Sequence, residues 1–362
     1  MQTNQPKQNN QKIKTAVIFG GYSSEYSVSL QSATAVLQNL DPEKYELVPV
    51  GITKAGDWFY YTGAFSKIQE DTWHLGNDCI PAALSPVRNS RCLLLFEKGG
   101  VRRLAVDLVF PVLHGKNGED GTVQGAAALA GIPLAGCGVL ASALCMDKDR
   151  AHRLVEAAGV RVPRAFVLKA GTDGKKAQEF AAQTGYPVFV KPVKAGSSYG
   201  ISKVGTPENL HNALVLAFQY DSEVIVEEAI DGFEVGCAVL GNDVLVTGEV
   251  DEIELSGGFF DFTEKYTLKT SAIHVPARID PVLAETVKKT AKVIYRALGC
   301  SGFARVDCFI TPQGGIVFNE VNTIPGFTEH SRYPGMMQAA GYSFREMLDR
   351  IVALALEEEG NR

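Results

Sequence analysis

Phe303-Ala-Arg-Val-Asp-Cys-Phe-Ile310 and Ile316-Val-Phe-Asn-Glu-Val-Asn322 are two mostly apolar runs, joined by the turn sequence Thr311-Pro-Gln-Gly-Gly315. Strand-forming runs separated by a short segment rich in proline and glycine predict a β-hairpin. We expect Thr311 to pair with Ile316, and this pairing sets which residues face each other along the two strands. The hairpin is the most informative local feature of the chain.

The expected register brings four polar side chains together. It places Asp307 across from Glu320 and Arg305 across from Asn322, all on one face, because side chains alternate with period two. Two directly opposed carboxylates repel each other unless a cation lies between them. Oxygen ligands from Asp, Glu and Asn suit Mg²⁺. The competing interpretation is a solvated polar face of a hairpin.

The composition limits the class of protein. With 362 residues and 46% hydrophobic content, the chain is long enough for two or three cores. A net charge of -6 leaves no overall positive field for a polyanion, so we expect no nucleic-acid partner. No apolar run reaches the roughly 20 residues that span a bilayer. The first residues are polar and have no apolar leader core, so we expect no membrane partner and a cytoplasmic location. The seven cysteines lack C-x-x-C spacing and are expected to be reduced core thiols.

The chain divides into a tail and three predicted domains. Residues 1–12 are polar and expected to be disordered. In residues 13–136, short apolar strands alternate with helical or polar stretches, which predicts an α/β domain with a parallel sheet. Its strands are expected at Thr15–Phe19, Tyr45–Ile52, Val106–Leu113 and Ile132–Leu134.

The other two predicted domains have an α+β pattern. Residues 137–231 form the smaller one, with helices expected at 151–158 and 175–184 and strands at 165–168, 188–191 and 224–227. Residues 232–362 contain strands between Glu234 and Val250, the hairpin, and helices near 282–298 and 344–356. A mobile loop rich in glycine and aromatic residues is expected at 256–270.

Three lysines occupy unusual places in the sequence: Lys148, Lys191 and Lys265. Lys191 ends an apolar strand and is followed by the small-residue loop Ala195-Gly-Ser-Ser-Tyr-Gly200, which offers a charge and free backbone N–H groups to a phosphate. A solvated lysine beside an ordinary hairpin turn is the alternative. Glu234 follows a glycine-containing turn, where it is either a carboxylate for ribose hydroxyls or an ordinary surface acid.

The loop Gly20-Gly-Tyr-Ser-Ser-Glu25 opens a helix but lacks the G-x-G-x-x-G order of a dinucleotide site. An acid at a helix N-terminus suits an ammonium group, although simple stabilisation by the helix dipole explains it as well. His114 lies where a buried strand opens into a glycine-rich loop, so we expect it at the carboxyl edge of the sheet, facing a ligand. A capped, structural histidine is the competing interpretation.

These motifs, in this order, resemble the D-alanine-D-alanine ligase family of ATP-grasp enzymes over about residues 13 to 355. The pattern is most similar to the D-alanine-D-serine ligases of vancomycin resistance. The matching stretches are Gly20-Gly-Tyr-Ser-Ser-Glu-Tyr-Ser-Val-Ser-Leu30, His114-Gly-Lys-Asn-Gly-Glu-Asp-Gly-Thr122, Met146-Asp-Lys148, Gly196-Ser-Ser198, Glu264-Lys-Tyr266 and Asn319-Glu-Val-Asn-Thr-Ile-Pro-Gly326.

The resemblance implies an ATP-grasp fold preceded by a parallel-sheet domain, a homodimer, and ATP and two Mg²⁺ ions as cofactors, with Mn²⁺ as an alternative metal. It assigns to the nucleotide Lys148, Lys191 and Lys265 (phosphates), Glu227, Ile230 and Phe259 (adenine side) and Glu234 (ribose). It assigns to the metals Asp307, Glu320 and Asn322. It assigns to the amino acids Glu25 and His114 (first substrate), Arg305 and Gly326 (oxyanion) and Ser331 (second carboxylate). Glu25, Ser197 and Tyr266 would tie the mobile loop to the site.

The implied reaction has two steps. ATP phosphorylates the carboxylate of D-alanine, and the amino group of a second amino acid then attacks the acyl phosphate. Metals and lysines would stabilise the charge of the transferring phosphoryl group. Loop closure would exclude water from the acyl phosphate.

The chain departs from typical D-alanine enzymes at the acceptor end. Its loop reads Phe259-Phe-Asp-Phe262, where those enzymes have tyrosines at the second and fourth positions, and Arg332 stands where they carry leucine. Arg332, paired with Asp251 and near Phe260, would make a polar pocket for a hydroxyl, which predicts D-serine as the second substrate, ahead of D-alanine. A solvated surface arginine is the alternative. Retention of Glu264-Lys-Tyr266 argues against D-lactate.

Two other functions compete with this hypothesis. A non-catalytic nucleotide-binding module would keep the fold, but the complete metal and lysine sets argue against it. A different ATP-grasp ligase, such as a relative of biotin carboxylase or glutathione synthetase, would lack Glu25 and Glu264-Lys-Tyr266, which indicate D-amino acids.

Overall fold

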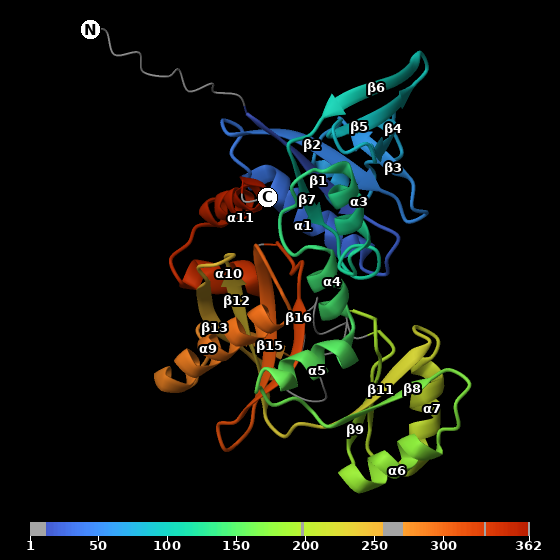
Figure 1. Ribbon diagram of the computed structural model, residues 1–362, viewed down its shortest axis with the longest axis vertical. Coiled ribbons are helices and arrows are strands. Elements are labelled where there is room, and N and C mark those ends of the chain that lie inside the picture. Colours follow the sequence, from blue (N-terminus) through green and yellow to red (C-terminus); the bar gives the residue numbers. More distant parts are fainter. Residues whose placement is uncertain (1–11, 197–198, 256–270, 329–330, 361–362) are drawn as a thin grey trace.

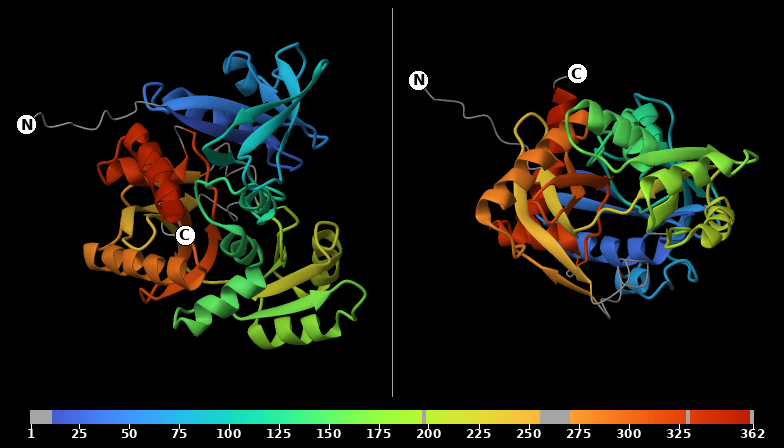
Figure 2. Two further views of the ribbon diagram at one scale, coloured as in Figure 1. Left: turned by 45° about the horizontal axis from the view of Figure 1, so that its top comes forward. Right: turned by 90° about the horizontal axis from the view of Figure 1, so that it is seen from below.

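The computed structural model describes residues 12–196, 199–255, 271–328 and 331–360. Within these residues the chain forms three β-sheets, which we call the N-terminal, central and C-terminal sheets (Figure 1). The N-terminal sheet lies at one end of the molecule. The central and C-terminal sheets lie beside each other at the other end, as Figure 2 also shows.

The N-terminal sheet has a parallel part and an antiparallel part, in the order β6-β5-β4-β3-β2-β1-β7. The parallel strands are β1 (Ile13–Gly20), β2 (Tyr45–Ile52) and β7 (Leu108–Val112). The antiparallel strands are β3 (Trp58–Tyr61), β4 (Cys79–Leu84), β5 (Cys92–Glu97) and β6 (Gly100–Ala105). The sheet is therefore mixed, and only its parallel part was predicted. The strand expected at Ile132–Leu134 is a single bridge between Leu134 and Val109.

Helices cover this sheet and lead toward the rest of the molecule. They are α1 (Tyr26–Asn39), α2 (Ser66–Gln69), α3 (Thr122–Ala130), α4 (Val139–Met146) and α5 (Lys148–Ala157). The last helix, α11 (Phe344–Gly360), returns to pack against α1 and β7. In Figure 1, α4 and α5 run from the N-terminal sheet to the level of the other two sheets.

The central sheet is antiparallel, in the order β10-β9-β11-β8. Its elements are β8 (Ala165–Lys169), α6 (Lys175–Thr184), β9 (Val188–Pro192), β10 (Ser202–Val204), α7 (Pro207–Ala217) and β11 (Glu223–Glu228). It has a hydrophobic core of its own, formed with α6 and α7. The expected helix and strands are present, and α7 and β10 are additional.

The C-terminal sheet is antiparallel, in the order β14-β13-β12-β15-β16. Its elements are β12 (Phe233–Leu240), β13 (Val246–Leu255), β14 (Ser271–His274), α9 (Pro281–Ala297), β15 (Phe303–Ile310), β16 (Ile316–Asn322) and α10 (Arg332–Ala339). Phe327, which follows β16, packs against Phe110 of β7 and Phe303 of β15, with ring centroids 6.1 and 5.4 Å away. The N-terminal and C-terminal sheets therefore share one hydrophobic core.

The predicted hairpin of β15 and β16 is present, with one difference in register. Asp307 pairs with Glu320, and Arg305 with Asn322, as predicted. Near the turn, however, Ile310 rather than Thr311 pairs with Ile316, so the predicted turn pairing is wrong. The register shifts by one residue after Asp307, and this β-bulge restores the predicted pairing at the far end of the strands.

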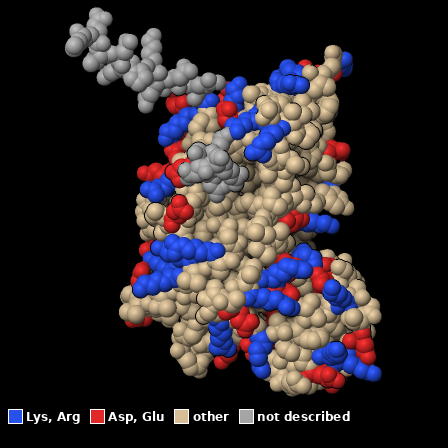
Figure 3. Space-filling view, in the orientation of Figure 1, with Lys and Arg blue, Asp and Glu red and all other residues tan. Residues whose placement is uncertain are grey.

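The surface and the helices agree with the charge and hydropathy of the sequence. On the face drawn in Figure 3, basic and acidic side chains are interspersed. Among the described residues, no helix is both long enough and apolar enough to cross a bilayer.

Candidate active site

The largest group of predicted site residues lines a cavity of about 460 Å³ between the central and C-terminal sheets. Its walls come from β9 and β11 on one side and from β12, β13 and β16 on the other. Predicted nucleotide and metal residues on these walls are Lys148, Lys191, Glu227, Ile230, Glu234 and Glu320. Side chains far apart in the sequence therefore converge on one cavity, as an ATP site requires.

Lys191 and Glu227 face each other across β9 and β11. The Lys191 ammonium lies 2.6 Å from Glu227 Oε2, and the Glu227 side chain is buried. Burial by itself would raise the pKa of the Glu227 carboxyl, but Lys191 and then His152 reverse this effect and lower it. The pair therefore places a positive charge at the cavity wall, held in position by a buried carboxylate.

Glu227 also fits a ligand with a hydrogen-bond donor. Within the described part of the chain, its buried Oε1 atom has no hydrogen-bond partner, and neither has His152 Nδ1, 3.9 Å away. Buried polar atoms are usually paired, so an unpaired acceptor in a cavity wall indicates a missing donor. The exocyclic amino group of adenine is such a donor.

Lys148 begins α5 and holds the small-residue loop in place. Its ammonium donates to Ala195 O at 2.7 Å, and its backbone N–H donates to Val193 O at 3.2 Å. Asp147, which precedes it, caps the helix by accepting from Arg150 N. This arrangement brings the phosphate-binding lysine of the prediction to the floor of the cavity, beside the loop that begins at Ala195.

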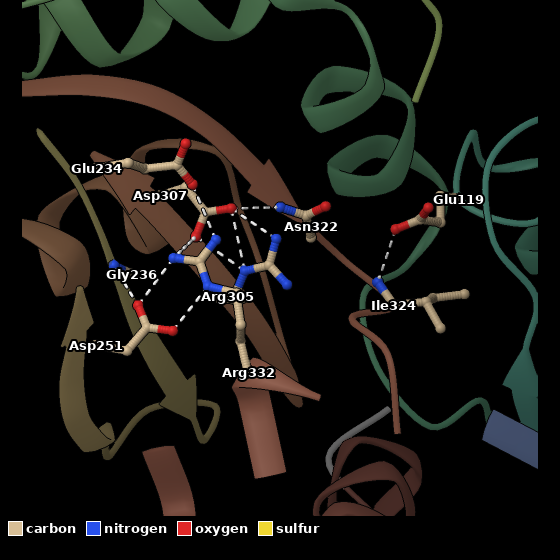
Figure 4. Close-up of polar contacts among 9 residues, drawn as sticks. All are labelled: Glu119, Glu234, Gly236, Asp251, Arg305, Asp307, Asn322, Ile324 and Arg332. Atoms are coloured by element: carbon tan, nitrogen blue, oxygen red, sulfur yellow. Dashed lines mark hydrogen bonds and ion pairs between the residues drawn. The ribbon is translucent and has the colours of Figure 1, made fainter. Parts of the chain in front are cut away.

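The predicted metal residues lie on the neighbouring strands β15 and β16, and Figure 4 shows two of them, Asp307 and Asn322. Asp307 is fully buried, and its carboxylate accepts from Arg305 at 2.7 to 3.1 Å and from Asn322 Nδ2 at 2.9 Å. Glu320, its cross-strand partner, lines the cavity.

This donor set fits Mg²⁺ bound together with a nucleotide. Among the described residues, no three His, Cys, Asp or Glu side chains gather into a complete metal cage. Mg²⁺ is usually held by one or two carboxylates together with substrate phosphates and water, rather than by a protein cage. Asp307 and Glu320 would supply the two carboxylates, and Asn322 would supply an amide oxygen. These metal ligands stay predictions.

A second cavity, of about 350 Å³, contains Glu25, which directly precedes α1. The Glu25 carboxylate fits between two glycines: a Cβ atom would lie 2.2 Å from Oε2 at Gly115 and 2.8 Å from it at Gly196. Any larger side chain at Gly115 would displace Glu25, and φ there is +70°. Glu25 therefore touches the loop that follows His114 and the small-residue loop at Gly196.

A small cavity of about 30 Å³, which we call the joining cavity, shares lining residues with both of these cavities. It shares Lys148, Ala195 and Glu320 with the nucleotide cavity, and Ala195 and Gly196 with the Glu25 cavity. A phosphoryl group between ATP and an amino acid at Glu25 would pass through this position.

His114 is held by protein atoms on both sides of its ring. Nδ1 lies 2.9 Å from Ile324 O, and Nε2 lies 3.2 Å from Ser32 Oγ. Burial lowers the pKa of His114 to about 4, so the ring is neutral at physiological pH. The competing structural interpretation accounts for these contacts, and the predicted contact of His114 with substrate stays a prediction.

Arg332 is buried and faces three carboxylates, so the interpretation of it as a solvated surface residue is wrong (Figure 4). Its Nε and Nη2 donate to Asp251 at 2.7 and 2.8 Å, confirming the expected pair. Its Nη1 donates to Glu234 at 2.9 Å, and Nη2 lies 3.3 Å from Asp307. A guanidinium has five N–H groups, and among the described residues only one of the two on Nη1 has a partner, Glu234.

Two glycines explain how Arg332 reaches this position. A Cβ atom at Gly248 of β13 would lie 2.8 Å from the backbone of Met336 in α10. A Cβ at Gly236 of β12 would lie 2.4 Å from Arg332 Nη2 and 2.7 Å from Asp251 Oδ1. Glycine at both positions allows α10 to pack closely on the sheet with Arg332, its first residue, above Asp251.

The segment between β16 and α10 carries two further predicted residues. Ser331 Oγ accepts from Thr328 N at 3.0 Å, and a Cβ atom at Gly326 would lie 2.7 Å from this oxygen. Gly326 and Ser331 therefore lie together, next to Arg332, as expected for an acceptor site. The predicted residues Ser197, Phe259, Phe260, Lys265 and Tyr266 lie outside the described residues.

Glu119 was not predicted as a site residue. It lines the small joining cavity, and its two oxygens accept from Gly115 N at 2.8 Å and Ile324 N at 3.1 Å. Burial and then the neighbouring Glu25 raise its pKa to about 8, although the two N–H groups oppose this. The sequence signal was present, since Glu119 belongs to the motif that begins at His114, but its partner Ile324 lies 205 residues away.

Comparison with known proteins agrees with this arrangement. Residues 14–137 match the family described as D-ala D-ala ligase N-terminus, and residues 154–353 match D-ala D-ala ligase C-terminus. The solved structure of the VanG D-Ala:D-Ser ligase from Enterococcus faecalis is 56% identical, with a TM-score of 0.89, covering 95% of this chain and 100% of that one. The D-alanine-D-alanine ligase from Coxiella burnetii is 29% identical, with a TM-score of 0.86, covering 97% and 95%.

Curated relatives fall into more than one group. A vancomycin C-type resistance protein of Enterococcus gallinarum is 44% identical over 350 residues, covering 96% of this chain and 99% of the relative. A putative D-alanine-D-lactate ligase of Streptomyces coelicolor is 46% identical over 350 residues, covering 95% and 98%. This chain belongs to the D-alanine-D-alanine ligase family and has its ATP-grasp fold.

Proposed function

We propose that this ATP-dependent ligase joins D-alanine to D-serine through a D-alanyl phosphate. In the first step a carboxylate oxygen of D-alanine bonds to the γ-phosphorus of ATP, and ADP leaves. In the second step the amine nitrogen of D-serine bonds to the acyl carbon, and the C–O bond to phosphate breaks. Phosphate leaves with that electron pair, and the reaction releases one proton.

The residues around the two cavities supply what these steps require. Lys148 and Lys191 meet the phosphates, and Glu25 meets the ammonium of D-alanine across the joining cavity. Bound Mg²⁺ would neutralise the charge of the transferring phosphoryl group. Asp307, Glu320 and Asn322 would hold two such ions, and we expect Mn²⁺ to replace Mg²⁺ in activity assays after metal removal.

The observation that supports D-serine is the buried placement of Arg332. A guanidinium beside the acceptor site, fixed by Asp251, offers a directed N–H to a hydroxyl. A buried polar group left without a partner disfavours a ligand that lacks the hydroxyl, so D-alanine should bind less well. The 56% identity to a solved D-Ala:D-Ser ligase supports the same choice.

The alternative is a ligase that makes the D-alanine dimer. A third acceptor, D-lactate, follows from the name of one relative but is disfavoured by retention of Glu264-Lys-Tyr266. We propose a homodimer by analogy with the family, and light scattering of the purified protein would test it.

The test is ligation by purified protein with ATP, Mg²⁺ and D-alanine, with and without excess D-serine or D-lactate. Phosphate release gives the rate, and mass spectrometry identifies the products. Mostly D-Ala-D-Ser is expected. Only D-Ala-D-Ala would show that Arg332 does not select the acceptor, and release of phosphate without any dipeptide or depsipeptide would refute ligation itself.

A further inference from the structure

The segment Ile324–Phe327, which follows β16, is held by three side chains of the N-terminal part: Ser32, His114 and Glu119. We call these three the clamp. Both backbone polar groups of Ile324 are engaged, because its N–H donates to Glu119 Oε1 at 3.1 Å and its carbonyl oxygen lies 2.9 Å from His114 Nδ1. Phe327 N–H donates to Ser32 Oγ at 3.2 Å. The segment is therefore fixed near both of its ends.

The hydrogens of the clamp have one consistent arrangement. A neutral His114 carries its proton on Nδ1, which donates to Ile324 O, so Nε2 is an acceptor. The Ser32 hydroxyl then donates to Nε2, and its oxygen accepts from Phe327 N–H. Every donor in this chain has an acceptor, which is typical of a rigid network.

The clamp leaves one backbone donor of the segment available. Pro325 has no N–H, and the N–H groups of Ile324 and Phe327 are used. Within the described residues, Gly326 N–H donates to no protein group, and Gly326 is half-buried while its neighbours are buried. Among the described residues, the network thus leaves Gly326 N–H as the available backbone donor of this segment.

The same side chains connect this donor to the first-substrate end. Ser32 lies on α1, seven residues after Glu25, which places the two on one helix face about 10 Å apart along the axis. Glu119 lines the joining cavity together with Lys148, Glu320 and Asn322. Two clamp residues therefore lie on parts of the chain that also serve the first-substrate end: Ser32 on the helix that follows Glu25, and Glu119 in the lining of the joining cavity.

We propose that Ser32 and Glu119 are positioning residues of the ligation step, which act with His114 to aim Gly326 N–H at the acyl group of the bound D-alanyl phosphate. This inference rests on the proposed function. In that step the amine nitrogen bonds to the acyl carbon and negative charge develops on the acyl oxygen. A backbone N–H held in advance stabilises this charge, and a shift of about 1 Å would cost roughly 100-fold in rate.

In phosphoryl transfer, the first step, no bond forms at the acyl carbon, so this negative charge does not develop on the acyl oxygen. Disruption of the clamp should therefore slow ligation, the second step, but leave the formation of ADP in the first turnover unchanged. Rapid-quench measurement of ADP in a single turnover, with ATP, Mg²⁺ and D-alanine, reports the first step. Steady-state formation of dipeptide reports the second.

Two variants disrupt different bonds of the clamp. Glu119→Gln replaces one of the two side-chain oxygens that now accept from backbone N–H groups with an amide donor, so one bond is lost. Ser32→Ala removes the hydroxyl between His114 and Phe327. Either variant should lower kcat for dipeptide formation roughly 10- to 100-fold. The KM for ATP should not change. The amount of ADP formed in the first turnover should still equal the amount of enzyme.

Two matched controls remove similar groups outside the clamp. Asp120→Asn changes the neighbouring acid, which accepts only from Asn117 N and Thr122 N of its own loop. Thr34→Val removes a buried hydroxyl on α1 that donates only to Leu30 O of the same helix. Both controls should keep kcat within about threefold of the unmodified protein, since neither touches the clamped segment.

The outcomes are distinct. Slow ligation with a full ADP burst in Glu119→Gln or Ser32→Ala supports the proposal, and Ser32→Ala decides it if Glu119→Gln is not recovered folded. An equal loss in both steps, or no loss in either, overturns it. If the unmodified protein makes no dipeptide, the proposed function fails; if it does and the clamp variants match it, only the clamp fails.

Discussion

Arg332 holds a buried group of carboxylates together, so its removal should destabilise the protein strongly. Arg332→Leu keeps an apolar side chain but removes the guanidinium that Asp251 and Glu234 face. Asp251 is fully buried and would keep only the N–H of Gly236 as a partner. Removing one partner of a buried ion pair costs about 3–5 kcal/mol. At roughly 2 °C per kcal/mol for a chain of this size, Tm should fall by about 6–10 °C.

The second variant tests the cause. In Arg332→Leu combined with Asp251→Leu no charge is stranded at this pair, and replacing a buried ion pair by apolar residues is often neutral. The double variant should therefore recover most of the lost Tm. Arg345→Leu is the matched control, because Arg345 is exposed and its partner Asp41 lies 3.7 Å away on the surface. It should change stability by less than about 1 kcal/mol.

Thermal unfolding of the ligand-free proteins, followed by circular dichroism, measures these differences. A Tm for Arg332→Leu within 2 °C (about 1 kcal/mol) of the unmodified protein would refute the reasoning. So would a double variant that is no more stable than Arg332→Leu, because Asp251 would then not be the stranded partner. The same proteins test specificity: Arg332→Leu should lower kcat/KM for D-serine relative to D-alanine.

Three other predictions follow from the site. Glu320→Gln should abolish ligation, measured as phosphate release, whereas near-normal turnover would contradict the metal assignment. His114, whose pKa falls from 6.5 to about 4 on folding, takes up a proton more readily when unfolded, so stability should fall as pH drops from 6.5 toward 4. The loss reaches about 3 kcal/mol and should be absent in His114→Asn; equal acid sensitivity of the two proteins would contradict a neutral buried ring. Gly236→Ala should force the Arg332 guanidinium away from Asp251 and lower the free energy of unfolding, measured in urea, by about 1–3 kcal/mol. An unchanged urea midpoint would show that the cluster has room for a methyl group.

Most strands and helices of the central and C-terminal sheets could be predicted from the sequence, because they have clear periodicity and turn signals, but β10, α7, β14 and α10 were not predicted. The antiparallel part of the N-terminal sheet was missed. Its strands β3 to β6 are four to six residues long. β6 is almost wholly exposed and β4 contains a proline, whereas β3 and β5 do have apolar runs, so for those two the sequence signal was present. α10 was missed because Pro334 and Gly335 lie within it, and both residues normally disfavour a helix.

In the hairpin of β15 and β16, the predicted pairing of the polar residues is correct although the predicted pairing at the turn is wrong. Asp307 lies opposite Glu320 as predicted, but the turn pairs Ile310 with Ile316, and a bulge corrects the register. No local sequence signal marks that bulge. Glu119 escaped prediction for a different reason: the contact that gives it a role is with Ile324, and only the shared core of the N-terminal and C-terminal sheets brings the two together.

The residues predicted at the acceptor, ribose and metal sites form one charged network, so one of them cannot be altered without affecting the others. Arg332 contacts Glu234, predicted to hold ribose, and Asp307, predicted to hold metal, while Asp307 also accepts from Arg305. A substitution at Arg332 should therefore change the KM for ATP and the metal requirement as well as the choice of acceptor. The effects on ATP binding and on the metal lower kcat/KM equally for D-serine and D-alanine, so they cancel in the ratio of the two kcat/KM values. This ratio, rather than either rate, therefore measures the selection of the acceptor by Arg332.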